Sequence, residues 1–235
     1  MSKTLVELAG LRFSYSQNHE VLCGIDFALC PGERVGLVGA IGCGKTTLLH
    51  LLVGLLKPTA GVIRAFGKTR TREADFHDVR ARMGLVFQDP DDQLFCPTVV
   101  EDVAFGPLNL GKPPKEARAI ATDTLRAVGL EGFEERVTYR LSGGEKRLVA
   151  LATVLAMQPD VLLLDEPTGG LDLESKTRIG AVLRALPQAM IIVSHEHDFV
   201  HEIATRILCI EKGRLVGAPP CCRHALDAAF GREAN

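Results

Sequence analysis

The sequence predicts an α/β fold built around a phosphate-binding loop. Apolar runs rich in β-branched residues alternate with helical patterns along the chain, which favours layers of sheet and helix over an all-helical or all-β fold. A glycine-rich segment, residues 39–46, lies between a predicted strand and a predicted helix, the setting in which such loops hold phosphate. At 235 residues, one large domain with a modest inserted subdomain can bury an ample core.

The predicted strands are short apolar runs bounded by turn residues or by helical patterns. Their lengths and their β-branched content separate them from buried helices. Six runs stand out: Arg34–Val38, Val62–Ala65, Gly84–Phe87, Val161–Leu164, Met190–Val193 and Ile207–Ile210.

Two helices and one break are predicted from the pattern of apolar residues. Lys45–Leu56 is apolar almost all round and predicts a buried helix, whereas Lys115–Val128 is amphipathic and predicts a surface helix that ends at Gly129. Gly106–Pro114 contains the most helix-breaking residues, so we expect a break in the chain there.

A third helix is predicted over Leu141–Met157. Ser142 precedes the apolar residues and Glu145 follows three positions later, which is the pattern of a reciprocal capping box. We therefore expect Ser142 to begin this helix.

Composition and charge narrow the classes of function. The chain is 46% hydrophobic, and 27 Lys and Arg against 29 Asp and Glu give a net charge of −2. So small a charge provides no field to attract nucleic acid, and no nucleic-acid partner is expected. The basic cluster within Arg64–Arg82 is interrupted by three acids and is interpreted as a solvated face.

Two further features predict the cellular compartment in which the chain occurs. Seven scattered cysteines, an odd number, indicate no disulfide framework and favour a reducing cytosol. The sequence has no basic leader, and no apolar run reaches the roughly 18 residues of a membrane span. We expect the chain neither to cross a membrane nor to be exported.

The strongest chemical signal is a match to the phosphate-loop template G-x-x-x-x-G-K-[ST]. Glycines allow successive backbone N–H groups to turn toward an anion at the positive end of a helix, and Lys45 adds a cation for the outer phosphates. The Thr46 hydroxyl is a candidate ligand of Mg²⁺. The alternative is a glycine-rich turn with an unrelated lysine. The candidate nucleotide-binding residues here are Gly39, Ala40, Ile41, Gly42, Cys43, Gly44, Lys45, Thr46 and Thr47.

A second chemical signal is an apolar run that ends in two acids, Asp165 and Glu166. In a phosphate-loop nucleotidase the aspartate at the strand end holds Mg²⁺, and the adjacent glutamate orients or activates the attacking water. Asp165 is therefore the predicted metal ligand and Glu166 the predicted general base. The alternative is a strand that ends in two solvated carboxylates.

These motifs, together with Leu141–Glu145 (LSGGE), resemble those of the ABC-type ATPases in order and spacing, from Tyr15 to about Gly213. The resemblance implies an N-terminal antiparallel β subdomain and an inserted helical subdomain at about residues 90–144, all within one ATPase domain spanning 1–235. Residues 214–235 would form a C-terminal tail. LSGGE is the most specific of the shared motifs.

The same resemblance implies roles for further residues. Tyr15 would stack on adenine, Gln88 would contact Mg²⁺ and the attacking water, and His195 would contact the γ-phosphate as a catalytic residue. The alternatives are that Tyr15 is an ordinary strand aromatic, Gln88 a surface amide and His195 a core histidine. In the family, a segment matching Ser142, Gly143 and Gly144 reaches the ATP of a second subunit, and Asp172 lies on the loop between the two sites. The expected partner is a second ATPase subunit, either another copy or a paralogue.

A narrower resemblance comes from Gln88–Pro107. Its sequence, QDPDDQLF followed by TV..DVAFGP, is similar to that of the ATPases of energy-coupling-factor importers. It implies integral membrane subunits that dock near Asp89–Phe105, on the cytoplasmic face of the membrane. The short C-terminal tail favours cobalt or nickel as cargo, with a vitamin as the alternative.

Other functions fit the sequence less well. A metal site built from the histidines after position 194 and from Cys221, Cys222 and His224 lacks a ligand spacing typical of such sites. A soluble ABC ATPase of DNA maintenance would need a long coiled coil between phosphate loop and signature, where no sustained heptad occurs. A regulatory or translation-type protein would be expected to carry two cassettes.

Overall fold

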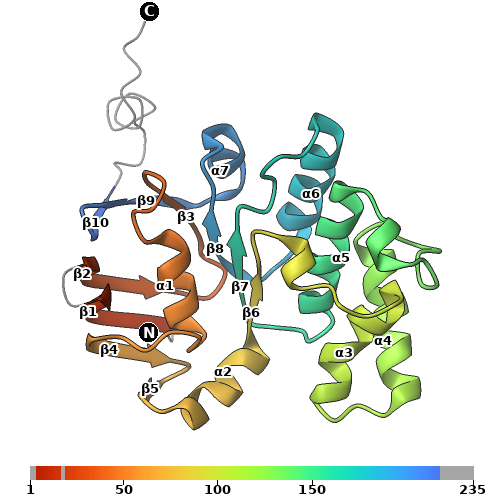
Figure 1. The fold of residues 1–235 in the computed structure, drawn as a ribbon, viewed down its shortest axis with the longest axis horizontal. Helices are drawn as coiled ribbons and strands as arrows, with labels where there is room; N and C mark the ends of the chain where they lie inside the picture. The colour runs from red at the N-terminus through yellow and green to blue at the C-terminus, as the bar shows by residue number, and fades with distance from the viewer. Residues whose placement is uncertain (1–3, 17–18, 218–235) are drawn as a thin grey trace, which may run out of the picture. The chain divides into compact units, whose positions relative to one another are not determined.

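The structure is a computed structural model that describes residues 4–16 and 19–217. The chain divides into two compact units, one made of residues 1–79 and 189–235 and the other of residues 80–188. Figure 1 labels the helices and strands of both units. In the part of the chain that the structure describes, no helix is both long and apolar enough to span a bilayer.

The first unit contains a four-stranded antiparallel sheet in the order β2-β1-β4-β5. Its strands are β1 (Val6–Ser16), β2 (His19–Leu29), β4 (Ala60–Ala65) and β5 (Lys68–Arg70). The pairing of β1 with β2 shifts register between Leu8 and Leu11, and this irregularity keeps both residues on the buried face. The predicted N-terminal antiparallel subdomain is confirmed.

The same unit also carries parallel strands. β3 (Arg34–Val38) pairs in parallel with β8 (Ala189–Val193) on one side and with β9 (Arg206–Glu211) on the other. β10 (Arg214–Gly217) adds antiparallel to β9. Every residue of β8 is buried, which explains its unbroken apolar sequence because strands covered on both faces need no polar side.

Helix α1 (Lys45–Leu52) follows β3 and is shorter than the predicted Lys45–Leu56. Gly54 adopts a positive φ of 72°, and the Leu55 N–H donates to His50 O while the Gly54 N–H donates to Leu51 O. This pair of hydrogen bonds is a Schellman motif, which ends a helix at a left-handed glycine. The apolar residues beyond position 52 masked this stop signal in the sequence.

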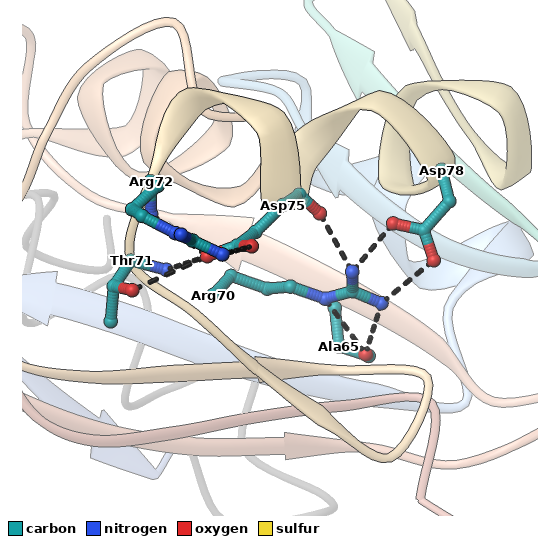
Figure 2. Close-up of polar contacts among 6 residues, drawn as sticks. All are labelled: Ala65, Arg70, Thr71, Arg72, Asp75 and Asp78. Carbon is teal, nitrogen blue, oxygen red and sulfur yellow. Dashed lines mark hydrogen bonds and ion pairs between the residues drawn. The ribbon is translucent and has the colours of Figure 1, made fainter.

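A buried arginine fastens the β4–β5 hairpin to the segment that follows it (Figure 2). Arg70 is 4% exposed, and its guanidinium donates to the carbonyls of Ala65 and Asp75 and to both carboxylate oxygens of Asp78. These residues belong to β4, to the 3₁₀ helix η1 (Glu73–Phe76) and to α2 (His77–Arg82). All five N–H groups of the arginine are thereby satisfied, as burial of a guanidinium requires.

Asp75 caps the start of η1. Its carboxylate accepts hydrogen bonds from the backbone N–H groups of Thr71 and Arg72 at 3.1 and 2.9 Å. Those backbone hydrogen bonds lower the pKa of Asp75 to about 2. Part of the basic cluster within Arg64–Arg82 is therefore internal structure, with Arg70 buried rather than solvated as predicted.

The second unit pairs two parallel strands with a group of helices. β6 (Met83–Val86) lies beside β7 (Val161–Asp165), with Val86 opposite Leu164. The helices are α3 (Val99–Asn109), α4 (Pro114–Ala127), α5 (Gly143–Leu155) and α6 (Leu173–Ala185), with short 3₁₀ turns η2 (Pro90–Asp92) and η3 (Thr138–Arg140). Helix α7 (His197–Ile203) belongs to the first unit.

The break expected over Gly106–Pro114 begins later than predicted. Helix α3 continues to Asn109 with Pro107 inside it. A side chain on Gly106 would lie 2.6 Å from Met157, so the glycine is retained for close packing rather than for a turn. Packing against the rest of the unit outweighs the helix-breaking tendency of these two residues.

Most of the predicted elements match the structure. The six predicted strands lie within one or two residues of β3, β4, β6, β7, β8 and β9, and the surface helix within one residue of α4. The helix predicted over Leu141–Met157 starts at Gly143, with Ser142 as its N-cap. Arg214–Gly217, predicted to begin the tail, form strand β10, and Cys221, Cys222 and His224 lie outside the described residues.

Candidate functional site

The glycine loop of the first unit joins β3 to α1. Gly39, Gly42 and Gly44 have positive φ values of 147°, 77° and 105°. A Cβ on Gly39 would lie 2.7 Å from both Cys43 Sγ and the carbonyl oxygen of Ile210. Neither the backbone conformation nor the space permits a side chain there, so the sequence needs glycine to form this loop.

Helix α1 starts directly from the loop, with Gly44 as its N-cap. The first backbone hydrogen bond of the helix is donated by Leu48 to Gly44 O at 2.9 Å. The N–H groups before it, those of residues 45–47, have no acceptor within the helix and form its positive end. The first turn of α1 contains no acidic residue that would repel an anion. An anionic group at this end of the helix is therefore stabilised.

Lys45 is 9% exposed, and its Nζ donates to Gly39 O at 2.8 Å and to Ala40 O at 3.0 Å. The sulfur of Cys43 lies 3.8 Å from the same nitrogen. The ammonium group is therefore held against the loop by two backbone carbonyls.

Two side chains near the loop, Ile41 and Tyr15, differ in their contacts. The Ile41 side chain is fully exposed at the tip. By contrast, the Tyr15 hydroxyl lies 3.0 Å from Thr47 Oγ1, and its ring meets Phe13 edge-on with centroids 4.8 Å apart. The Tyr15 ring remains 60% exposed beside the start of α1, so a flat face is available there for stacking.

His195 follows β8 in the first unit, and its side chain is exposed. Ser194, directly before it, is buried and accepts a hydrogen bond from the Glu196 N–H at 3.0 Å. The exposure of His195 contradicts the alternative of a core histidine.

In the second unit, β7 ends in the two predicted acids. Asp165 is 3% exposed and Glu166 is 9% exposed, so neither is a solvated surface carboxylate. Glu166 has φ of 47°, a left-handed conformation that costs a residue with a side chain about 1 kcal/mol. Backbone strain of this kind concentrates at functional positions.

The signature segment forms the predicted capping box. The Ser142 N–H donates to Glu145 Oε2 at 2.7 Å, and the Glu145 N–H donates to Ser142 Oγ at 3.3 Å. The backbone hydrogen bond from Ser142 lowers the pKa of Glu145. Ser142 and Gly143 are exposed, so a hydroxyl and the positive end of α5 lie at the surface.

The structure brings the signature turn together with the loop of Asp172. A Cβ on Gly144 would lie 2.3 Å from Ser175 Oγ, so only glycine fits here. Ser175 in turn donates from its N–H and its hydroxyl to Asp172 at 2.9 and 2.8 Å, which makes Asp172 the N-cap of α6 and lowers its pKa. Two predicted site segments thus meet through Ser175, which sequence analysis did not identify.

Gln88 is exposed at the start of the loop after β6, and the side chain of Arg147 approaches its backbone. Nη1 of Arg147 donates to Phe87 O at 3.3 Å and to Gln88 O, and Nη2 donates to Gly169 O at 3.3 Å. Sequence analysis did not identify Arg147. The available signal was its place on the buried stripe of α5, one turn before Leu151, where a charge requires internal partners.

An exposed aromatic pair lies on the predicted docking segment. Phe95 is 66% exposed and Phe105 is 44% exposed, and their rings meet edge-on with centroids 4.9 Å apart. Asp102, which is 3% exposed, accepts hydrogen bonds from the N–H groups of Phe95 and Cys96 at 3.0 and 2.9 Å. The buried carboxylate therefore fixes the backbone that presents Phe95.

Comparison with protein families places these segments in one group of proteins. The family described as ABC transporter matches residues 22–169. An energy-coupling factor transporter ATP-binding protein EcfA of Methanothermobacter thermautotrophicus is 42% identical and is matched over 98% of this chain and 76% of its own length. A cobalt import ATP-binding protein CbiO of Syntrophus aciditrophicus is 42% identical over 90% of this chain and 77% of its own length.

Solved structures that resemble this chain are also ATP-binding cassettes. CbiO1 from Clostridium perfringens, part of the ABC transporter complex cbiONQ, superposes with a TM-score of 0.84 at 33% identity, over 97% of this chain and 91% of that one. A dimer of the ATP-binding cassette MJ0796, in a post-hydrolysis state bound to ADP and Pi, has a TM-score of 0.81 at 25% identity, over 89% of this chain and 96% of that one.

Proposed function

The chain belongs to the ABC transporter family of ATPases, and from this membership we propose that it powers a membrane importer of the energy-coupling-factor type. We further propose cobalt or nickel ions as the cargo. The relatives named EcfA and CbiO support the importer class, and the name of the second supports the metal. The single observation that carries the proposal is the segment Gln88–Pro107, whose sequence resembles that group and whose aromatic residues are exposed.

Within this proposal, the first unit binds the triphosphate and the base of ATP. The N–H groups at the start of α1 and the Lys45 ammonium stabilise the negative charge of the phosphates. Residues 39–44 form the loop around the phosphates, in which the Cys43 N–H donates to Ala40 O at 3.2 Å, and Thr46 and Thr47 follow in the first turn of α1. The exposed ring of Tyr15 stacks on adenine, and His195 contacts the γ-phosphate.

Magnesium fits the donors predicted for it. The Thr46 hydroxyl, the Gln88 amide and the Asp165 carboxylate would hold the ion through oxygen, the element that Mg²⁺ prefers, and Asp165 is a buried carboxylate at a strand end. When bound, the ion neutralises charge on the outer phosphates. We therefore include Mg²⁺ with ATP in the proposed function.

Glu166 is the proposed general base. Its carboxylate accepts the proton of the attacking water, while Gln88 orients that water. Because Glu166 is buried and its backbone is left-handed, we propose that its carboxylate is held in one orientation before the reaction. Preorganisation of this kind lowers the barrier without reorganisation during the step.

The signature turn is proposed to act on the nucleotide of a second ATPase subunit, either another copy of the chain or a paralogue. Ser142 and Gly143 are exposed at the positive end of α5, with Gly144 packed beneath them. This end of the helix would stabilise the γ-phosphate of the partner's ATP. Asp172 lies at the start of α6 beside the same turn and would face the interface. ATP then holds two subunits together, and hydrolysis releases them.

Residues 90–144 form the proposed inserted subdomain of a single ATPase domain, and they carry the proposed docking surface for the membrane subunits. This docking surface comprises Phe95 and Phe105 with the acids Asp91 and Asp92. Exposed aromatic residues beside acids fit an apolar helix that also carries basic residues. Docking of this kind would place the chain peripherally on the cytoplasmic face of the membrane.

The experiment that tests the proposal is co-purification of the chain with its membrane subunits, followed by ATPase measurements in the reconstituted assembly. Cobalt or nickel should stimulate ATP turnover, whereas a vitamin that stimulates it instead would favour the alternative cargo. Phe95→Asp should preserve the fold and ATP binding but release the membrane subunits. Leu173→Asp, at an apolar position on α6 that is 80% exposed, is the control outside the docking surface and should co-purify in full yield.

A further inference from the structure

Arg147 is a buried cation whose hydrogen bonds go to two different loops. It is 9% exposed on α5, five positions after the signature serine Ser142. Nη1 donates to the carbonyls of Phe87 and Gln88 before the 3₁₀ turn η2, and Nη2 donates to the carbonyl of Gly169. Among the described residues, its hydrogen-bond acceptors are all backbone carbonyls.

The charge of Arg147 is costly to bury. Burial lowers the pKa of its guanidinium, while the negative charges of Asp89, Glu166 and Asp165 act in the opposite direction. An apolar residue would fill the same place in the apolar stripe of α5 without this penalty. The arginine therefore needs an explanation beyond the packing of the helix.

The loop after Gln88 has other ties to α5. The Gln93 side chain donates to Ala150 O and to Thr153 Oγ1 at 2.7 Å each, and Lys146 pairs with Asp91 at 2.6 Å. The loop after Glu166 ends at Asp172, the N-cap of α6, and Ser175 on α6 lies so close to Gly144 that a Cβ there would be 2.3 Å from its Oγ. The hydrogen bonds of the Arg147 side chain, by contrast, reach both loops.

We propose that Arg147 is a positioning residue that couples the Gln88 loop (residues 87–93) and the Glu166 loop (residues 166–172) to the signature helix. Movement of α5 at the subunit interface would then move both loops in step. The inference rests on the proposed function, because that function assigns Gln88 and Glu166 to the reaction and Ser142 to the interface.

The geometry explains why the residue is arginine. The two terminal nitrogens of a guanidinium diverge in one plane, so one can donate to residues 87 and 88 while the other donates to residue 169. A lysine has a single ammonium group and cannot span both loops with the same directions. Arg147→Lys therefore keeps the charge but removes the coupling, and Arg147→Met removes both.

Hydrogen exchange of the full-length chain tests the coupling directly. In both variants we expect backbone amides in residues 87–93 and 166–172 to exchange at least about tenfold faster, while helix α4 is unchanged. Arg126→Met, an exposed arginine on α4 that pairs with Asp123, is the control and should alter neither loop. Acceleration of one loop alone, or of neither, would overturn the proposal.

Kinetics give a second readout that simple loss of stability would not produce. In the reconstituted assembly, the variants should lower kcat for ATP hydrolysis by at least about tenfold while KM changes less than twofold, because the residues proposed to bind a subunit's own phosphates, Lys45 and the start of α1, lie in the other unit. A rise in KM that matches the loss in kcat would contradict a positioning role. If the reconstituted wild-type assembly does not hydrolyse ATP, the proposed function fails, and hydrogen exchange still decides on the coupling.

A measurement on the wild-type chain covers the case in which a variant does not fold. Exchange at increasing, sub-denaturing concentrations of urea should show the two loops opening with the same free energy and the same dependence on urea. Two loops that open independently would refute the coupling without any substitution.

Discussion

The carboxylate of Asp102 lies 3.1 Å from the hydroxyl of Thr138, inside the second unit. Asp102 belongs to α3, which carries Phe105, and Thr138 lies four residues before the signature serine. Backbone pairing supports the same connection, because Thr98 bridges Val137 and the Val99 N–H donates to Arg136 O. The proposed docking surface and the approach to the signature turn are thus held together by one buried acid.

Asp102→Ala should destabilise the chain by about 2 kcal/mol, since it leaves the N–H groups of Phe95 and Cys96 without their acceptor. Urea unfolding would measure this loss, and Asp123→Ala on the exposed face of α4 serves as control. A second readout is Cys96, whose pKa is raised to about 11 by burial and by the charge of Asp102. In Asp102→Asn the thiol should therefore react with an alkylating agent at lower pH. Unchanged stability and unchanged labelling would show that the acid does not organise this segment.

Glu166→Gln should retain ATP binding and lower turnover by about 10²–10⁴-fold, because an amide cannot accept the proton of water. Steady-state release of phosphate and equilibrium binding of a fluorescent ATP analogue measure the two properties separately. Glu174→Gln, an exposed acid at the start of α6, should hydrolyse ATP at the wild-type rate. Wild-type turnover in Glu166→Gln would remove Glu166 from the reaction.

Ser142→Arg should leave nucleotide affinity within about twofold and abolish ATP-dependent dimerisation, because a bulky cation would replace the hydroxyl at the interface. The Glu166→Gln background prevents turnover, so light scattering with and without ATP can follow the dimer. Lys45→Ala gives the opposite pattern, with binding itself weakened. An ATP-dependent dimer of the Ser142 variant would mean that this turn does not meet a partner's nucleotide.

Acid should weaken the junction between the β4–β5 hairpin and η1. The pKa of Asp75 is about 2 in the folded chain against an ordinary value of 3.8, so its contribution to stability is present above pH 3.8. That contribution is lost as pH falls from about 4 to about 2. Thermal unfolding of wild type and Asp75→Asn between pH 6 and pH 2 tests this, and the two melting temperatures should converge at low pH. A constant difference across the range would exclude ionisation of Asp75 as its source.

Local chemistry explains which elements were predictable from the sequence. Strands such as β7 and β8 are unbroken apolar runs, and the capping box of Ser142 and Glu145 uses only residues three positions apart. The end of α1 was missed because Leu55 and Leu56 continue the apolar pattern past Gly54. The extent of α3 was missed because the packing of Gly106 on Met157 involves residues far apart in sequence.

The residues of the candidate site likewise divide into those that local sequence predicts and those that depend on distant contacts. The glycine loop and the acids after β7 were identified because their chemistry lies in consecutive residues. Arg147 and Ser175 were not, because their roles depend on contacts with loops about 20 to 60 residues away. The positive φ of Glu166 could not be predicted either, because a glutamate in the sequence gives no sign of a left-handed backbone.

The chain contains no tryptophan and only two tyrosines, so its tyrosine fluorescence comes from two places alone. One is Tyr15, tied through its hydroxyl to Thr47, and the other is Tyr139, 73% exposed three residues before Ser142. Each phenol is thus a built-in optical probe, one beside the glycine loop and one beside the signature turn. Replacing either with phenylalanine leaves a single tyrosine, so changes at the glycine loop and at the signature turn could be timed separately without attaching a dye.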